Sequence, residues 1–223
     1  MRKNQRIHII TGHYGSGKTE FAINYAIKKA QIQNNIALGD LDIINPYFRS
    51  REKKSLLKQK GIKVVSSTME SSSADIPALS PEIYTILQDQ NLETILDIGG
   101  DQAGARVLAR YREYFNKGQY DMWMVINANR PNTQNIENIM KYIEEIQEVS
   151  GIFITGLINN THMLRETTKE DIIRGNQLLK EVSELTGLPI VYTSVIKEII
   201  DTLPEGIEGD IFPLTLIMRP EWL

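Results

Sequence analysis

The stretch Thr11-Gly12-His13-Tyr14-Gly15-Ser16-Gly17-Lys18-Thr19 carries the spacing G-x-x-x-x-G-K-T directly after an apolar run at residues 7–10. Glycines in such a loop let backbone N–H groups wrap a phosphate chain, Lys18 offers a charge to the outer phosphates, and the Thr19 hydroxyl binds Mg²⁺. A helical pattern follows over residues 17–33, so strand, loop and helix occur in the order that phosphate binding requires. We therefore predict a nucleotide-binding loop whose contacts come from Gly12, His13, Tyr14, Gly15, Ser16, Gly17, Lys18 and Thr19.

The composition bounds the domain organisation and the classes of partner. A chain of 223 residues with 41% hydrophobic and 24% charged residues is long enough for one sizeable core, so we expect residues 1–223 to form a single domain. The formal net charge of −3 gives no global basic field, which argues against nucleic acid as a partner. Cysteine is absent, which excludes disulfides and cysteine-ligated metal centres supplied by this chain.

The chain also lacks the patterns that direct a protein to a membrane. No apolar run approaches the length of a membrane span, and residues 1–6 lead into the first strand without a signal-peptide core. The stretch 211–220 is apolar, but prolines interrupt it and it has one basic residue, unlike a basic amphipathic anchor. We expect no membrane partner and a cytoplasmic location.

Strands and helices alternate along most of the chain. Period-two and apolar runs predict strands at 36–42, 62–65, 94–98, 122–128, 152–159 and 189–195. Helical patterns lie at 49–60, 80–89, 103–115, 133–149 and 168–186, and the polar stretch 66–77 reads as a loop or lid. This alternation predicts an α/β fold with three layers, α/β/α, around a mostly parallel sheet, the P-loop NTPase fold.

A carboxylate closes the predicted strand at 94–98. Asp97-Ile98-Gly99-Gly100 has the spacing D-x-x-G, in which the aspartate holds Mg²⁺ through water and the glycine N–H meets the terminal phosphate. We therefore predict that Thr19 and Asp97 are metal ligands and that Gly100 contacts the nucleotide. The bland alternative, an aspartate that only caps the next helix, is weakened by a second acidic strand end.

That second strand end is Gly39-Asp40-Leu41-Asp42. Residues two apart on an extended chain face the same side, so both carboxylates approach the metal and the attacking water. Here the chain resembles the deviant-Walker ATPases of the MinD/ParA/CobQ-CobB family, in the SIMIBI class of P-loop proteins, whose second strand likewise ends in D-x-D. The resemblance implies a metal-side role for Asp40 and a water-side role for Asp42, which makes Lys18 and Asp42 the predicted catalytic pair.

The resemblance extends to the base of the nucleotide. Gly156-Leu157-Ile158-Asn159-Asn160 is similar to the family strand whose terminal asparagine hydrogen-bonds adenine, and it marks Asn159, while Asn160 fits a turn nearly as well. Residues 127–131 look like the family loop after the preceding strand. A guanine-reading N-K-x-D is absent, because 116–119 lacks the aspartate and precedes a strand. ATP with Mg²⁺ is therefore expected, in preference to GTP.

One position departs from the family pattern. Family members carry a signature lysine in this loop that reaches across a dimer to the partner's nucleotide, and His13 occupies its place. A protonated His13 replaces that charge if phosphate favours the imidazolium form; the alternative is that His13 is a plain loop residue.

Three functions fit these patterns. The leading hypothesis is an ATPase that switches the loops after Asp42 and Asp97 to regulate or load an unidentified protein partner, with a nucleotide-dependent homodimer as one form of the switch. The alternatives are a small-molecule kinase or ATP-dependent ligase of cobyrinate or dethiobiotin synthetase type, and a nucleotide-gated binding module with negligible turnover. In the kinase or ligase case, Arg49, Arg51 and Arg106 would bind a small acidic substrate.

Overall fold

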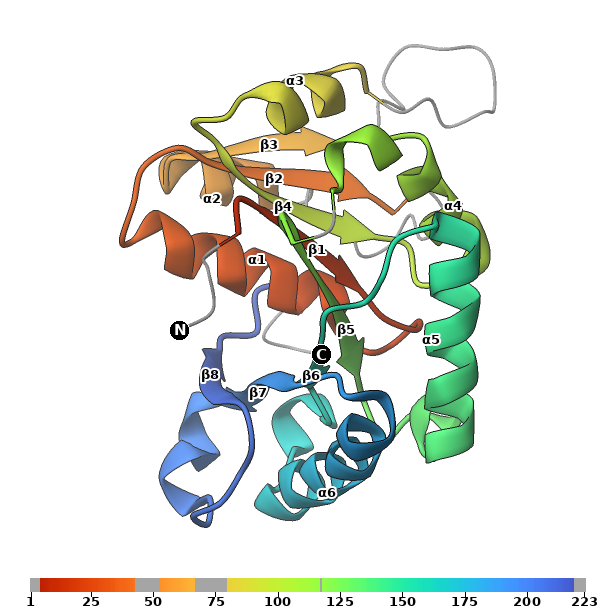
Figure 1. The fold of residues 1–223 in the computed structure, drawn as a ribbon. Coiled ribbons are helices and arrows are strands. Elements are labelled where there is room, and N and C mark those ends of the chain that lie inside the picture. Colours follow the sequence, from red (N-terminus) through yellow and green to blue (C-terminus); the bar gives the residue numbers. More distant parts are fainter. Residues whose placement is uncertain (1–4, 43–52, 67–79, 117, 219–223) are drawn as a thin grey trace, which may run out of the picture.

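An eight-stranded parallel sheet forms the centre of the molecule (Figure 1). The computed structural model describes residues 5–42, 53–66, 80–116 and 118–218. The strands run in the order β3-β2-β4-β1-β5-β6-β7-β8, and every pair of neighbours is parallel. Their bounds are β1 Ile7–Thr11, β2 Ile36–Leu41, β3 Ile62–Ser66, β4 Glu93–Ile98, β5 Tyr120–Ile126, β6 Gly156–Asn159, β7 Ile190–Ile196 and β8 Asp210–Leu214.

Helices cover both faces of this sheet. Their bounds are α1 Lys18–Ala30, α2 Lys54–Gln59, α3 Glu82–Gln88, α4 Gln102–Ala109, α5 Ile136–Ser150 and α6 Lys169–Thr186. One apolar core joins the sheet to α3, α4, α5 and α6, and a second joins the opposite face to α1 and α2. The three-layer α/β/α architecture is the one predicted from the alternation of strands and helices.

Strand β8 is the main element that the sequence pattern did not predict. It pairs with β7, with Val195 opposite Pro213, at one end of the described sheet. Proline has no N–H for a ladder hydrogen bond, so it is tolerated in an edge strand that has one neighbour only. The sequence analysis assigned no strand to residues 211–220, and the structure adds β8 there.

Three element boundaries also differ from the sequence prediction. Helix α4 ends at Ala109 and gives way to a 3₁₀ turn at Arg112–Tyr114, and β6 starts only at Gly156, although Ile152 and Ile154 before it are buried. Helix α2 starts at Lys54. The predicted loop at 66–77 lies largely outside the described residues, as do Arg49 and Arg51.

A buried polar cluster lies at the amino ends of β1, β4 and β5, at the opposite edge of the sheet from the glycine-rich loop. His8 Nε2 lies 2.8 Å and Lys29 Nζ 2.6 Å from Glu93 Oε1, and His8 Nδ1 lies 3.3 Å from Asp121 Oδ2. Burial alone would raise the pKa of Glu93, but the hydrogen bonds from His8 and Lys29 outweigh it and lower this pKa to about 2. The cluster ties helix α1 to three central strands.

Candidate functional site

The carboxyl ends of β1, β2 and β4 bring the predicted loop and acids together. Asp40 of β2 stands opposite Asp97 of β4 in the strand register, and Ile10 of β1 stands opposite Asp97 on the other side. Asp40, Asp97 and Asp42 are almost wholly buried. In open α/β sheets, ligands bind outside the carboxyl ends of the strands, which is where this cluster lies.

The glycine-rich loop passes from β1 into α1 through Gly17, the N-cap residue of the helix. Gly17 has φ 82°, and a Cβ atom built on it would lie 2.4 Å from Asn160 Nδ2. Both the backbone conformation and the close approach of Asn160 therefore require glycine here. The loop leaves the first N–H groups of α1 directed at the site, as a phosphate-binding loop does.

Lys18 is the buried cation of the site. Its Nζ atom lies 2.9 Å from Asp42 Oδ2, and the residue is 6% exposed. Burial alone would lower the pKa of Lys18, but the charges of Asp97, Asp42 and Asp40 outweigh it and raise this pKa. One fixed positive charge thus faces three clustered carboxyl groups.

Thr19 and Asp97 meet where Mg²⁺ is predicted. The Thr19 hydroxyl donates to Asp97 Oδ2 at 2.7 Å, while the buried Asp97 Oδ1 accepts no hydrogen bond from any described residue. Burial, together with the charge of Asp40, raises the pKa of Asp97 to about 7 despite opposing effects of Lys18 and Thr19. A hydroxyl and carboxylate oxygens are the donors that Mg²⁺ prefers, so these residues fit the ion.

The D-x-x-G segment packs directly against the glycine-rich loop. A Cβ atom built on Gly100 would lie 2.2 Å from the Gly12 carbonyl oxygen, so only glycine allows this contact. The Tyr142 hydroxyl of α5 donates to the Gly100 carbonyl. A Cβ atom on Gly99 would lie 3.2 Å from Asp42 Oδ1, which places the two acidic strand ends side by side.

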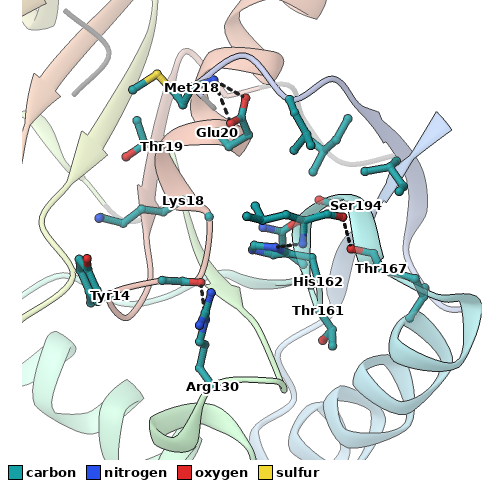
Figure 2. Close-up of a pocket in the computed structure, with 18 residues that line it drawn as sticks. Tyr14, Lys18, Thr19, Glu20, Arg130, Thr161, His162, Thr167, Ser194 and Met218 are labelled. Atoms are coloured by element: carbon teal, nitrogen blue, oxygen red, sulfur yellow. Dashed lines mark hydrogen bonds between the residues drawn. The ribbon is translucent and has the colours of Figure 1, made fainter. Parts of the chain in front are cut away.

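A cavity of about 290 Å³ opens beside the loop (Figure 2). The loop and α1 supply one wall, the segment after β6 supplies a second, and the ends of β7 and β8 supply a third. The lining residues are Tyr14, Gly15, Gly17, Lys18, Thr19, Glu20, Arg130, Asn160, Thr161, His162, Leu164, Thr167, Ile172, Ser194, Ile196, Leu214, Leu216 and Met218. The loop end of this cavity is polar, and the far end, at β8, is apolar.

Asn159 and Asn160, at the end of β6, have side chains in different environments. Asn159 Nδ2 donates to the Ile172 carbonyl at 3.1 Å, and its Oδ1 accepts from the Thr161 N–H and hydroxyl. Asn159 does not line the cavity, whereas Asn160 does, and Asn160 Nδ2 donates to the Ser16 carbonyl at 2.7 Å. Successive residues of a strand face opposite sides, which explains the difference. The contact between Asn159 and adenine stays a prediction, and its amide is already hydrogen-bonded within the protein.

Residues of the same chain hold the His13 side chain through hydrogen-bonding contacts. Its Nε2 atom lies 2.9 Å from Asn132 Nδ2, and its Nδ1 atom lies 3.2 Å from the Tyr14 carbonyl oxygen. Both ring nitrogens of His13 therefore already have hydrogen-bonding neighbours within the protein. The ring edge also contacts Tyr142, with centroids 5.6 Å apart.

Two parts of the cavity were not found by sequence reasoning. Arg130, before the 3₁₀ turn Pro131–Thr133, donates from Nε to the Gly15 carbonyl oxygen at 3.1 Å. Glu20 accepts from the Ile217 N–H at 2.6 Å and the Met218 N–H at 3.1 Å, so it fixes the segment after β8 as a cavity wall (Figure 2). The sequence pattern of residues 211–220 showed an apolar stretch interrupted by prolines, and it gave no sign of ligand binding.

Comparisons with known proteins bear on the fold. No protein-family model and no curated protein matches the chain. Among solved structures, FtsY from Mycoplasma mycoides matches with TM-score 0.58 and 18% identity over 87% of this chain and 61% of its own. FtsY from Thermotoga maritima matches with TM-score 0.55 and 17% identity over 87% and 63%. The signal recognition particle receptor FtsY from Elizabethkingia anophelis, solved with GDP, matches with TM-score 0.53 and 17% identity over 87% and 58%.

The chain therefore spans about three fifths of the length of these neighbours. In the described part of the chain, no helix is long and apolar enough to cross a membrane. The parallel sheet, the glycine-rich loop between β1 and α1 and these likenesses lead to one conclusion: this chain has the three-layer α/β fold of P-loop NTPases.

Proposed function

We propose that this chain is a Mg²⁺-dependent ATPase of MinD/ParA-like type that changes conformation on ATP binding and hydrolysis. The observation that carries the proposal is the meeting of Lys18, Thr19, Asp97 and Asp42 at one end of the sheet, beside a loop of phosphate-binding geometry. Lys18 would bind the outer phosphates. Thr19 and Asp97, with Asp40 behind them, would hold Mg²⁺, which neutralises charge on the phosphate chain.

Asp42 is our candidate for the residue that activates water. In hydrolysis the water oxygen bonds to the γ-phosphorus, the water proton passes to Asp42, and the electron pair of the broken P–O bond leaves on ADP. Asp42 lies 2.9 Å from Lys18, so a phosphate chain that attracts Lys18 competes for the same ammonium group. Nucleotide binding would thereby free the carboxylate for the water.

Adenine is our proposed base, although one of the structural neighbours was solved with GDP. Asn160 has its Oδ1 and one Nδ2 proton uncommitted to the described residues, and an asparagine pairs with N6 and N7 of adenine. Guanine shows two acceptors at that edge, and its opposite edge needs a carboxylate. The acid that lines the cavity is Glu20, whose oxygens already accept backbone N–H groups.

ATP is expected to bind in the presence of Mg²⁺ with a Kd between about 1 μM and 1 mM, which is roughly −8 to −4 kcal/mol. GTP is expected to bind at least about tenfold more weakly, because Glu20, the acid among the described lining residues, already accepts backbone N–H groups and is not offered to guanine. Isothermal titration calorimetry with each nucleotide and with tripolyphosphate separates the base from the phosphates. No binding of ATP would overturn the proposed function, and preference for GTP would overturn the choice of base.

The pair Asn160→Ala and Asn159→Ala tests which asparagine meets the base. We expect Asn160→Ala to weaken ATP by about tenfold or more, the worth of one bidentate base contact, while tripolyphosphate binds as in wild type. Asn159→Ala should instead lower the melting temperature, because it removes buried hydrogen bonds to Ile172 and Thr161. Calorimetry and thermal unfolding of both variants give the answer. Selective loss of ATP binding in Asn159→Ala would restore the original assignment.

The same proposal includes an unidentified partner. The switch would be read at the loops that follow Asp42 and Asp97, of which residues 43–52 lie outside the described residues. A nucleotide-dependent homodimer is one form of that readout, and Tyr14, 62% exposed beside the cavity, is an apolar contact available to it.

A further inference from the structure

Arg130 lies on the outer rim of the glycine-rich loop, opposite the side where α1 begins (Figure 2). Its Nε atom donates to the Gly15 carbonyl oxygen at 3.1 Å, and its side chain passes over Gly15. A Cβ atom built on Gly15 would lie 3.0 Å from Nε and 3.4 Å from Cζ of this arginine. The guanidinium group therefore rests directly on the loop that is proposed to hold the phosphates.

The backbone around Arg130 is fixed before any ligand binds. The Arg130 N–H donates to the Asn127 carbonyl at 3.0 Å, and the Thr133 N–H donates to the Arg130 carbonyl at 2.9 Å. The Thr133 hydroxyl also donates to the Asn127 carbonyl, at 2.7 Å. The turn holds the backbone of Arg130, and the bond from Nε to the Gly15 carbonyl holds its side chain, so little further freedom is lost when the arginine meets an anion.

The two terminal nitrogens of Arg130 are available to a ligand. Nη1 and Nη2 have no hydrogen-bond partner and no acidic partner among the described residues, so four N–H donors stay uncommitted at the cavity rim. A guanidinium fork pairs with two oxygens of a phosphate at once, which makes arginine well suited to this ligand.

The site also needs a second cation. Lys18 is the single buried cation that the loop contributes, and Asp42, Asp97 and Asp40 surround it. His13, in the place of the signature lysine, has both ring nitrogens engaged by Asn132 and the Tyr14 carbonyl. A nucleotide triphosphate carries several negative charges, so a further positive group next to Gly15 would stabilise it.

We propose that Arg130 binds the phosphate chain of the nucleotide in cis, through Nη1 and Nη2, and supplies from the same subunit a second positive charge beside that of Lys18. This inference rests on the proposed function. When the bond to the γ-phosphorus breaks, the electron pair moves onto the diphosphate, and a guanidinium at this rim favours that product charge. Hydrolysis by this route needs no charge from a second subunit.

The experiment compares Arg130→Ala and Arg130→Lys with wild type, using ATP, ADP and AMP with Mg²⁺ in calorimetry. We expect Arg130→Ala to weaken ATP by about 10- to 100-fold, ADP by less, and AMP hardly at all, since charged hydrogen bonds to phosphate are lost. Arg130→Lys should recover part of the loss, because it keeps the charge without the fork. Turnover should fall in Arg130→Ala and rise again when guanidinium chloride is added.

Lys141→Ala is the matched control, because Lys141 is a 75% exposed cation on α5 whose acidic neighbour lies 3.9 Å away. It should bind all three nucleotides as wild type does. Equal weakening of ATP, ADP and AMP in Arg130→Ala would reduce Arg130 to a support for Gly15 and overturn the inference. Unchanged ATP binding would overturn it as well. Both outcomes require that wild type binds ATP, so neither is confused with failure of the proposed function.

Discussion

Lys18→Ala is expected to lower the affinity for ATP by about 100-fold or more and to remove measurable turnover. Lys18 is the cation at the centre of the site, 2.9 Å from Asp42 and close to Asp97 and Asp40. Its loss removes the cation that lies among these three carboxyl groups, so their charges repel the phosphates, at a cost of about 3 kcal/mol. Calorimetry with ATP and Mg²⁺ measures the loss, and a phosphate-release assay measures turnover.

Asp42→Asn is the matched variant, since it breaks the same ion pair from the other side. We expect it to bind ATP at least as tightly as wild type, because Lys18 no longer has a carboxylate competing for it. Its turnover should fall by about 100- to 10,000-fold, the usual range for loss of a general base. An equal loss of ATP affinity in both variants would place Asp42 in nucleotide binding and not in water activation.

Glu93→Gln is expected to destabilise the protein by about 3 kcal/mol at pH 6, without a direct effect on the nucleotide site. Glu93 is buried between His8 and Lys29, and Glu93→Gln removes the carboxylate charge that both side chains contact. Urea unfolding followed by circular dichroism measures the change. Glu184→Gln, on the exposed side of α6, is the control and should unfold as wild type does.

The difference in stability between wild type and Glu93→Gln is expected to depend on pH. The folded-state pKa of Glu93 is about 2 against an ordinary value of 4.5, so its stabilisation is complete above pH 4.5 and is lost as the pH falls towards 2. The difference in unfolding free energy between wild type and Glu93→Gln should therefore shrink from about 3 kcal/mol to near zero over that window. A difference that stays constant from pH 6 to pH 2 would show that the carboxylate charge is not what stabilises the cluster.

Sequence reasoning succeeded where one local pattern implies one geometry. The glycine spacing before Lys18 requires a loop between a strand and a helix, and the structure has β1, the loop and α1 in that order. The proximity of Asp40 and Asp97 could be predicted, because the carboxyl ends of parallel strands lie at a common edge of the sheet. The β2–β4 register then places the two residues directly opposite each other.

Sequence reasoning fell short where the result depends on one residue of register or on distant contacts. Asn159 and Asn160 are adjacent and chemically identical, and only the direction of the strand end decides which one faces the cavity. The apolar wall of Leu214, Leu216 and Met218 comes from the short edge strand β8 and the segment after it, and Pro213 interrupts the strand pattern there. The sequence gives no sign that Arg130 differs from any other loop arginine, because its contact with Gly15 depends on the tertiary structure.

The contact between Glu20 and the segment after β8 has a consequence for how this protein folds. Glu20 and Met218 are 198 positions apart in the sequence, and Asn24 is joined to Thr215 in the same way across 191 positions. A cavity closed by such distant segments forms only when the sheet between them is complete, late in folding. A ligand bound there would protect the whole sheet against unfolding, so backbone amides far from the cavity, in β3 and α3, would exchange more slowly as well.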